Sequence, residues 1–244
     1  MEFNKYKKKG AYHWEDDKRS IFKFNAHQEA RFEWILRCLD DVKGKTVLDV
    51  GCGDGALTYR IAKKGAEVIG LDNSKEGIEL AKEIFNKKKI SANFILASAY
   101  NMPVKNDSID CAVLSDVIEH VREPEKVLKE IKRVLKNNGK VVISTPYRFG
   151  EILWDKYHVR EYCPSELKAS LESDFKNIEI IESHSALWMF LYTYNSRWTA
   201  YQPIFRWFAN VLALWFRFNP FLTDGRNRRR FDRFVQITAV AYKK

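Results

Sequence analysis

The chain has 244 residues, of which 45% are hydrophobic and 30% charged, and its formal net charge is +10. This composition supplies a full hydrophobic core, so it excludes a disordered chain and suits one α/β domain with an insertion. The four cysteines are far apart without a C-x-x-C pair, which argues against a thiolate zinc site or a disulfide framework. The positive charge favours polyanionic partners: nucleic acid, phosphorylated small molecules or an anionic membrane surface.

The N-terminal part predicts a helical cap over residues 1–43, with apolar residues at helical spacing in 27–39. Residues 1–9 are polar and Lys-rich, so we expect no secretory signal. The longest apolar stretch, 204–218, contains arginines and is shorter than the roughly 20 residues that span a bilayer. We therefore expect a cytoplasmic protein, or one attached peripherally to the inner face of the membrane.

Short apolar strands then alternate with amphipathic helices, which is typical of a parallel sheet covered on both faces. The predicted strands are 46–50, 67–71, 93–97, 110–115, 140–144, 177–182 and 234–242, and the predicted helices are 56–64, 75–87, 123–135 and 165–172. We expect a Rossmann-like α/β fold with a seven-stranded, mostly parallel sheet. Its parts are the cap, a core over 44–182, an inserted segment over 183–233 and a final core strand over 234–244.

A Gly-rich turn follows the first strand of this core, in the sequence VLDVGCGDG (47–55). Its glycines allow a sharp turn and a close approach of a ligand to the start of the next helix. Asp72, at the end of the next strand, can accept hydrogen bonds from both hydroxyls of a ribose. Gly51, Gly53 and Ala56 also match the dinucleotide pattern of an NAD(P)-dependent oxidoreductase. However, Asp49 would attract a cationic ligand and repel a pyrophosphate.

The sequence here resembles the class I methyltransferases that use S-adenosylmethionine (SAM). The resemblance covers residues 44–182, with 234–242 as the usual last strand. It rests on five segments in order: VLDVGCGDG, GLDNS, ASAYNMPV, IDCAVLSDVIEHV and LKNNGKVVISTP.

The resemblance implies SAM as cofactor and assigns a role to each matching residue. The residues it places around SAM are Asp49, Gly51, Cys52 and Gly53 in the turn, Asp72 and Asn73 at the ribose and adenine, Ser98 and Ala99 at the adenine edge, and Ser115 beside the sulfonium. Many relatives have an aspartate in place of Ser98. We interpret Cys52 as a packing residue and not as a nucleophile.

Within this group the chain is most similar to ubiquinone-biosynthesis-type O-methyltransferases, through Glu119-His120-Val121 after the fourth strand. These enzymes tend to have an arginine eighteen residues before the acidic residue of the Gly-rich turn, which is Asp49 here. That position is Arg31, which either binds the SAM carboxylate or is a solvated helix residue. Asp116 is expected on one helical turn with Glu119 and His120.

That group would bind a divalent cation, supply a general base or brace the following loop. His158 belongs to a second stretch that borders the acceptor pocket in similar enzymes, and it is our first choice for contact with the acceptor. Tyr12 and Trp14 are expected to cover the same pocket.

The inserted segment is exceptionally aromatic, with thirteen aromatic residues between 187 and 221 and an arginine cluster directly afterwards at Arg226, Arg228, Arg229, Arg230 and Arg233. A helix after Pro203 would carry one narrow polar stripe formed by Arg206, Asn210, Ala213 and Arg217. Such a helix suits an anionic membrane surface, an apolar lid over a lipid-like acceptor, or packing against the domain or a second copy. The predicted function is therefore methyl transfer to an oxygen of a small or lipid-linked acceptor at the membrane surface. An RNA methyltransferase that uses the basic aromatic region is the alternative.

Overall fold

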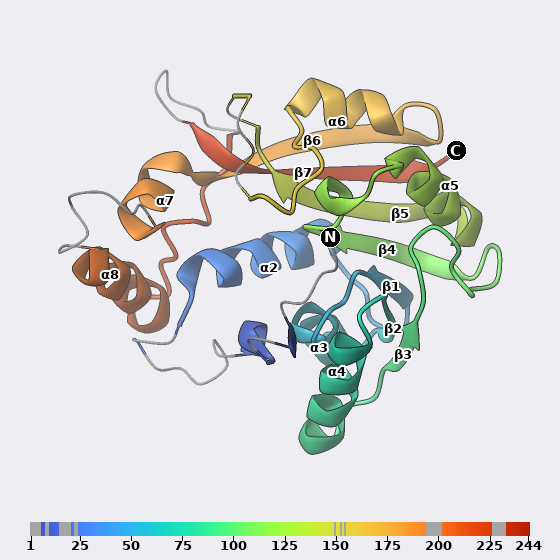
Figure 1. Cartoon of the computed structure of the whole chain (residues 1–244), viewed down its shortest axis with the longest axis horizontal. Coiled ribbons are helices and arrows are strands. Elements are labelled where there is room, and N and C mark those ends of the chain that lie inside the picture. The colour runs from blue at the N-terminus through green and yellow to red at the C-terminus, as the bar shows by residue number, and fades with distance from the viewer. Residues whose placement is uncertain are drawn as a thin grey trace.

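Figure 1 shows the computed structural model of the chain, which describes residues 6–7, 10–14, 21, 24–148, 150–151, 153, 155–193, 202–225 and 233–244. Its centre is a seven-stranded sheet in the order β3-β2-β1-β4-β5-β7-β6. The strands are β1 Thr46–Val50, β2 Glu67–Asp72, β3 Asn93–Leu96, β4 Ile109–Ser115, β5 Leu135–Pro146, β6 Phe175–Ser185 and β7 Phe234–Lys243. Only β7 runs antiparallel to its neighbours, β5 and β6. The predicted fold class is confirmed.

Helices cover both faces of the sheet, and each face has its own hydrophobic core (Figure 1). The helices are α2 Ala26–Leu39, α3 Ala56–Lys63, α4 Lys75–Lys88, α5 Pro124–Val134, α6 Pro164–Leu171, α7 Ala186–Thr193 and α8 Gln202–Trp215. Helices α5 and α6 pack on one face through their apolar stripes, and α2, α3 and α4 pack on the other. The 3.6-residue periodicity of these segments produces this arrangement, because each stripe is buried against a strand surface.

Local sequence signals place the element boundaries close to those predicted. Ser74 caps α4 by accepting a hydrogen bond from the Gly77 backbone N–H, and Pro164 occupies the first turn of α6. Strand β5 begins five residues earlier than predicted, since Leu135 pairs with Ile109 of β4. The polar residues between 136 and 139 do not have the apolar pattern of a strand, so this extension was not predicted.

The strand order changes direction at β1, which has β2 on one side and β4 on the other. The loops that leave the carboxyl ends of β1 and β4 therefore run to opposite faces of the sheet. They leave a crevice there, which is the usual ligand position in open α/β sheets.

Helices α7 and α8 form a separate small unit beside the start of α2 (Figure 1). A third hydrophobic cluster packs α7 and α8 against the start of α2, and its residues are Phe24, Ala26, Ala30, Tyr192, Ala209 and Phe221. Within the described part of the chain, no helix combines the length and apolar character needed to cross a membrane. Tyr194, Trp198, Tyr201 and the arginines from Arg226 to Arg230 lie outside the described residues.

The predicted polar stripe on α8 is wrong. Asn210 is fully buried, and its side-chain amide donates to the backbone carbonyls of Ile21 and Phe24. Arg217 lies beyond the end of the helix, in a left-handed conformation with φ 54°. Asn210 is turned inward because it finds hydrogen-bond partners there, whereas Arg206 stays exposed and most of the aromatic side chains of the helix face outward.

Candidate active site

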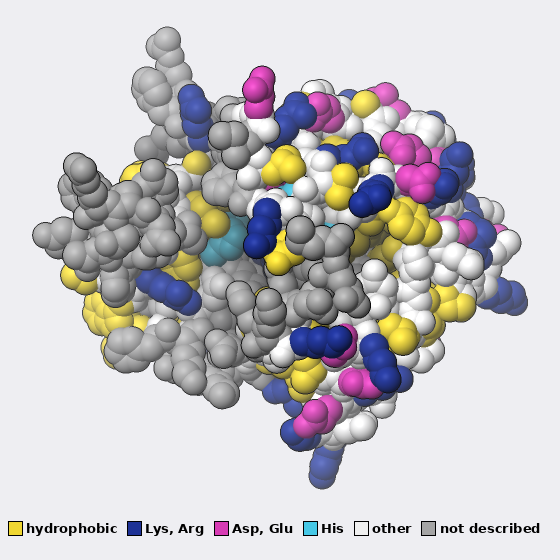
Figure 2. Space-filling view, in the orientation of Figure 1, with side chains coloured by type: hydrophobic (Ala, Val, Ile, Leu, Met, Phe, Trp, Pro, Cys, Tyr) yellow, Lys and Arg dark blue, Asp and Glu magenta, His cyan; other side chains and the backbone are white. Residues whose placement is uncertain are grey.

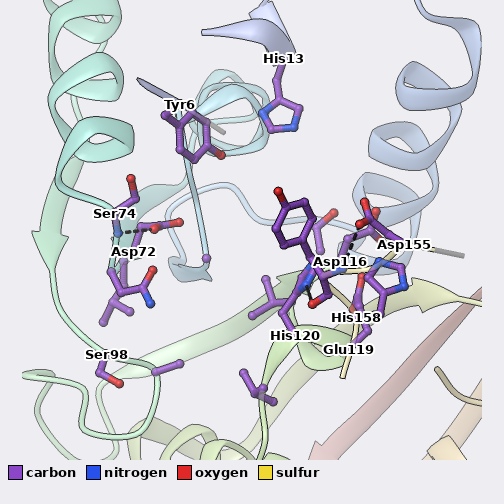
Figure 3. Close-up of a pocket in the computed structure, with 18 of the residues that line it drawn as sticks. Tyr6, His13, Asp72, Ser74, Ser98, Asp116, Glu119, His120, Asp155 and His158 are labelled. Carbon is purple, nitrogen blue, oxygen red and sulfur yellow. Dashed lines mark hydrogen bonds between the residues drawn. The ribbon is translucent and has the colours of Figure 1, made fainter. Parts of the chain in front are cut away.

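A cavity of about 850 Å³ opens at the carboxyl ends of the parallel strands. Its lining includes one residue at or just beyond the end of each central strand: Gly51, Asp72, Ser98, Ser115 and Pro146. Figure 3 shows Asp72, Ser74 and Ser98 on one wall, facing Asp116, Glu119, His120 and His158 on the other. A second cavity of about 50 Å³ adjoins it and shares Arg31, Gly51 and Ser115 in its lining.

The Gly-rich turn brings the backbone against both cavities. Gly51 and Gly55 have φ values of 74° and 78°, which non-glycine residues rarely adopt. A Cβ at Gly51 would overlap the Val117 side chain, and one at Gly53 would overlap the Tyr6 hydroxyl. Gly53 also has a positive φ, of 53°, so backbone conformation favours glycine at both positions, and a Cβ at either one would displace a neighbouring side chain.

Asp72 is fixed at the end of β2 by two backbone hydrogen bonds. Its two oxygens accept from the N–H groups of Gly53, at 2.8 Å, and Ser74, at 2.7 Å. Burial raises the pKa of Asp72 above its ordinary value, while these bonds oppose the rise. Each carboxylate oxygen keeps a second lone pair, so the group can still accept hydrogen bonds from two hydroxyls in the cavity.

Asp49 lies in the smaller cavity and is 1% exposed. The Thr58 hydroxyl donates to its Oδ2 at 2.6 Å. Burial raises the pKa of the Asp49 carboxyl to about 7, against the opposing effect of the Thr58 bond. A cationic ligand beside Asp49 would favour the charged carboxylate, so this site is suited to a sulfonium or an ammonium group.

Two buried polar atoms near Asp49 have no hydrogen-bond partner, namely Arg31 Nε and Ser115 Oγ. The Arg31 side chain is 15% exposed and forms an ion pair with Asp116, so the alternative of a solvated helix residue is wrong. Buried donors of this kind usually have partners. A ligand with a carboxylate and an ammonium group, like the methionine part of SAM, fits this end of the cavity.

The predicted cofactor residues therefore gather around one pair of cavities. Their lining includes every predicted cofactor residue except Gly53, that is Arg31, Asp49, Gly51, Cys52, Asp72, Asn73, Ser98, Ala99 and Ser115. Gly53 is close by and donates its N–H to Asp72. Burial raises the pKa of the Cys52 thiol well above its ordinary value, which is consistent with a packing role.

The N-terminal segment covers this end of the cavity and is attached to the Gly-rich turn through Asp54. The His13 backbone N–H and ring nitrogen both lie 3.1 Å from the Asp54 carboxylate. Trp14 Nε1 donates to the Asp54 carbonyl oxygen at 2.7 Å. Tyr12 lines the cavity, whereas Trp14 is buried in the core and does not line it, so the prediction that Trp14 covers the pocket is wrong.

Glu119 is fully buried on the opposite wall and braces the loop after β5. Its Oε2 accepts from the Thr145 hydroxyl, and its backbone carbonyl accepts from the Val159 N–H at 2.8 Å. Oε1 has no hydrogen-bond partner. Burial, and then the nearby Asp116 carboxylate, raise the pKa of Glu119 well above its ordinary value. Glu119 therefore braces the loop and keeps one buried oxygen without a partner.

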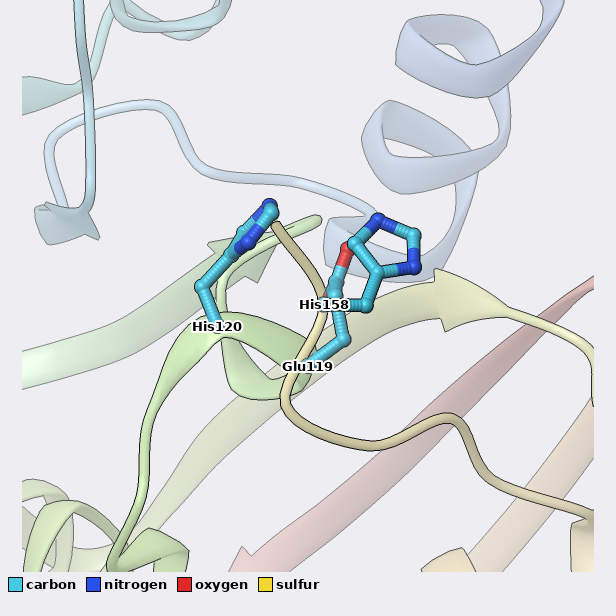
Figure 4. A group of neighbouring side chains, drawn as sticks. All are labelled: Glu119, His120 and His158. Atoms are coloured by element: carbon cyan, nitrogen blue, oxygen red, sulfur yellow. The ribbon is translucent and has the colours of Figure 1, made fainter. Parts of the chain in front are cut away.

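His120 and His158 complete this wall, and their ring centroids are 4.9 Å apart (Figure 4). His158 Nδ1 lies 2.6 Å from the carboxylate of Glu161, whose side chain is buried. A carboxylate at Nδ1 fixes the tautomer in which Nε2 is the proton acceptor. Ligand atoms of Glu119, His120 and His158 all lie within 4.8 Å of one another, so the group can either accept a proton or hold a divalent cation.

The predicted single helical turn of Asp116, Glu119 and His120 is wrong. Asp116 has φ 53° and precedes a short 3-10 helix, η2, which spans Ile118–His120. This left-handed residue turns the Asp116 carboxylate toward Arg31 and toward Gln236 of β7, whose side-chain amide donates to it at 2.7 Å. His158 takes the place beside Glu119 and His120 that the sequence had assigned to Asp116.

The comparisons with known proteins agree with this geometry. The family described as a methyltransferase domain matches residues 41–208, more than half of the chain. The chain belongs to this family of SAM-dependent methyltransferases. The match decides against the dinucleotide-dependent oxidoreductase.

Individual relatives are similar to this methyltransferase over shorter or more distant matches. The ubiquinone biosynthesis O-methyltransferase of Aliivibrio fischeri is 33% identical over 116 residues, which cover 47% of this chain and 50% of that protein. The chain thus spans about half the length of the curated relatives that it matches. Among solved structures, the phosphoethanolamine N-methyltransferase 2 of Haemonchus contortus, in complex with S-adenosylhomocysteine, has a TM-score of 0.66 at 19% identity, covering 98% of this chain and 59% of that one. A SAM-dependent methyltransferase from Archaeoglobus fulgidus has a TM-score of 0.61 at 20% identity, covering 91% and 96%.

Several residues of the site were not predicted from the sequence. Tyr6 and His13 line the cavity, and Glu161 orients His158. The spacing of His158 and Glu161, three residues apart, was the available signal. Gln236 carried no such signal, because the strand that holds it is 120 residues away from Asp116 in the sequence.

Proposed function

We propose that this protein binds SAM in the crevice between β1 and β4 and transfers its methyl group to an oxygen of a small or lipid-linked acceptor. The observation that carries the proposal is a pair of carboxylates, the buried Asp49 and the half-buried Asp72, at the carboxyl ends of adjacent strands. Bound SAM would supply a methyl group activated by its sulfonium. The chain itself would mainly hold the two reactants in line.

Each part of the cavity would hold a different part of SAM. Asp72 would accept hydrogen bonds from the ribose hydroxyls. Asn73, Ser98 and Ala99 would contact the adenine. At the other end Asp49 would face the positive charge, and Arg31 Nε and Ser115 Oγ would gain the partners that they lack.

The opposite wall would receive the acceptor. An acceptor hydroxyl must lose its proton as it attacks the methyl group, and His158 Nε2 would take it while Glu161 holds the ring. Relatives named for ubiquinone biosynthesis O-methylation support oxygen as the acceptor atom. The same residues support a second arrangement, in which a divalent cation on Glu119, His120 and His158 binds the acceptor oxygen.

Replacing His158 by Ala should lower the rate of methyl transfer by about 10²–10⁴-fold, as expected for loss of a general base. S-adenosylhomocysteine affinity should change little, because His158 is on the opposite wall from Asp72 (Figure 3). The measurement is transfer of a labelled methyl group to lipid, quinone-precursor and RNA extracts of the source cells. Lys168→Ala on the exposed side of α6 is the matched control. A rate within threefold of the unsubstituted enzyme would exclude His158 as the base, and loss of activity with EDTA would favour the cation.

We also propose that the protein acts at an anionic membrane surface. The residues that face outward from α8 and the turn after it are large and apolar, and they are Ile204, Phe205, Trp207, Phe208, Trp215, Phe216 and Phe218. We call this set the aromatic face; Figure 2 shows hydrophobic side chains at the α8 end of the molecule. Arg206, Arg217 and Arg233 are exposed as well, and Arg217 lies between Phe216 and Phe218 in the sequence. None of the described residues of α7 and α8 lines the cavity, so this arrangement favours a surface contact over an acceptor lid.

Replacing Trp207, Trp215 and Phe216 together by Ser should reduce binding to phosphatidylglycerol-containing vesicles by at least about tenfold, since each buried aromatic side chain contributes about 1.5–3 kcal/mol. Co-sedimentation measures this partitioning. Leu96→Ser removes an exposed apolar residue from β3, at the other edge of the sheet, and should have no effect. Equal sedimentation of the triple variant and the unsubstituted protein would contradict the proposal. Steeply salt-dependent RNA binding would instead favour the RNA alternative.

A further inference from the structure

The aromatic face and the cavity contact the same helix. Helix α2 packs against α7 and α8 through Ala26 and Ala30, which belong to the small third cluster. Gln28 and Arg31, in the same two turns of the helix, line the cavity. Two sites that are separate on the surface therefore share the first two turns of α2.

Buried hydrogen bonds from α7 and α8 fix the start of α2. The Ala26 N–H donates to the Tyr192 hydroxyl at 3.0 Å, and that hydroxyl lies 3.0 Å from Asn210 Oδ1. The Asn210 amide donates to the carbonyls of Ile21, at 2.7 Å, and Phe24, at 2.8 Å. Arg206 lies with its guanidinium 5.5 Å above the Tyr192 ring. The first N–H groups of a helix need external partners, and here Tyr192 supplies one.

On the cavity side, the same turns of α2 carry the groups that a ligand would contact. Arg31 pairs with Asp116 and has the unpartnered Nε, and the Gln28 amide donates to the His13 carbonyl under the N-terminal segment. Any shift of α2 would move Arg31 relative to Ser115 and Asp49. Helices α7 and α8 therefore contact the same two turns of α2 that carry Arg31.

We propose that engagement of the aromatic face by an anionic membrane and occupation of the cavity by SAM or S-adenosylhomocysteine strengthen each other through α2. The inference rests on the proposed function. A surface that holds α8 also holds Tyr192 and Asn210, and through them the start of α2. Helices of 8 and 14 residues are marginal alone, so α7 and α8 depend on their packing and hydrogen bonds with α2 and the residues before it.

An anionic membrane is the partner that this surface fits. Its aromatic residues would enter the interface between headgroups and acyl chains, while Arg217, next to Phe216 and Phe218 in the sequence, would reach lipid phosphates. The net charge of +10 adds long-range attraction to the same surface. A second copy of the chain carries the same net charge of +10, which opposes its approach to this surface.

The test measures both affinities in both directions. Calorimetry gives the S-adenosylhomocysteine affinity with and without vesicles of phosphatidylcholine and phosphatidylglycerol, and co-sedimentation gives vesicle affinity with and without S-adenosylhomocysteine. We expect vesicles to raise the first affinity about fivefold, and S-adenosylhomocysteine to raise the second by the same factor, because coupling of two binding equilibria is reciprocal.

Tyr192→Phe separates the coupling from binding itself. It keeps the ring in the cluster but removes the hydroxyl that joins Ala26 and Asn210, and Tyr192 does not line the cavity. This variant should still bind vesicles, while the vesicle-induced gain in S-adenosylhomocysteine affinity falls to less than twofold. Trp215→Ser should instead lose vesicle affinity and keep the S-adenosylhomocysteine affinity measured without vesicles.

Each outcome contradicts a different proposal. Absence of S-adenosylhomocysteine binding would overturn the proposed function. Binding of vesicles and of S-adenosylhomocysteine without mutual strengthening would overturn the coupling alone. Full coupling in the Tyr192→Phe variant would overturn the route through α2, and absence of vesicle binding would overturn the membrane partner and the coupling together.

Discussion

Asp72→Ala should weaken binding of S-adenosylhomocysteine by at least about 100-fold. Hydrogen bonds to a charged acceptor contribute about 1.5–3 kcal/mol each, and the proposed ribose contact uses two. Calorimetry is the measurement. The substitution also removes the acceptor for the Gly53 and Ser74 N–H groups. The thermal stability of the ligand-free variant should therefore be measured alongside its affinity.

Two controls separate ligand contact from local structure in this experiment. Glu83→Ala removes an exposed carboxylate from α4 and should leave the affinity unchanged. Asp72→Asn keeps one acceptor oxygen for the backbone and should fold more stably than the Ala variant while still binding weakly. If Asp72→Ala bound S-adenosylhomocysteine with normal affinity, the ribose assignment would be wrong.

Asp49 should make SAM binding depend on pH around neutrality. The carboxyl has a pKa of about 7 in the ligand-free protein, and a cation beside it favours the charged form. Below pH 7 the carboxyl must release a proton before the charged ligand is stabilised. We therefore expect the affinity for SAM to fall by up to about tenfold per pH unit between pH 7 and pH 5. Asp49→Asn should bind weakly and without this dependence.

The same carboxyl should make the free energy of unfolding fall as pH rises. The folded protein holds the Asp49 proton more tightly than the unfolded chain does, because the folded pKa of about 7 exceeds the ordinary value of 3.8. This contribution is complete below about pH 4 and is lost as pH rises through about 7. The slope it adds between these values is about 1.4 kcal/mol per pH unit.

Denaturation of the ligand-free protein at several pH values measures this slope. Asp49→Asn should remove it, so that the variant becomes more stable relative to the unsubstituted protein as pH rises toward 8. Asp107→Asn, at an exposed loop, is the control. Parallel stability curves for the Asp49→Asn variant and the unsubstituted protein would show that Asp49 is charged in the folded state near pH 5.

Much of the fold could be predicted because its signals are local. The strands from β1 to β4 and the helices α3 to α6 begin and end within one or two residues of the predicted bounds. Their periodicity, proline and serine caps and glycine turns act over a few residues. The cofactor side of the cavity follows from the same order, since the carboxyl ends of parallel strands meet at one edge.

The acceptor side of the site was predicted less well. His120 and His158 were chosen separately, but the sequence placed Asp116 beside Glu119, where the structure places His158. A single left-handed residue at Asp116 decides this, and its conformation is held by Arg31 and Gln236 from distant parts of the chain. Backbone handedness at one position cannot be inferred from periodicity.

By itself the sequence determined the alternation of strands and helices, the Gly-rich turn and the two carboxylates that follow adjacent strands. Hydrophobic periodicity and glycine stereochemistry depend on residues that are close in the sequence, so they can be recognised from the sequence alone. Only the tertiary structure decided which side of α8 faces outward, because Asn210 is buried by partners 186 and 189 residues away. An amide that finds two carbonyls in the interior gains more by burial than by hydration, and its aromatic neighbours are left on the surface.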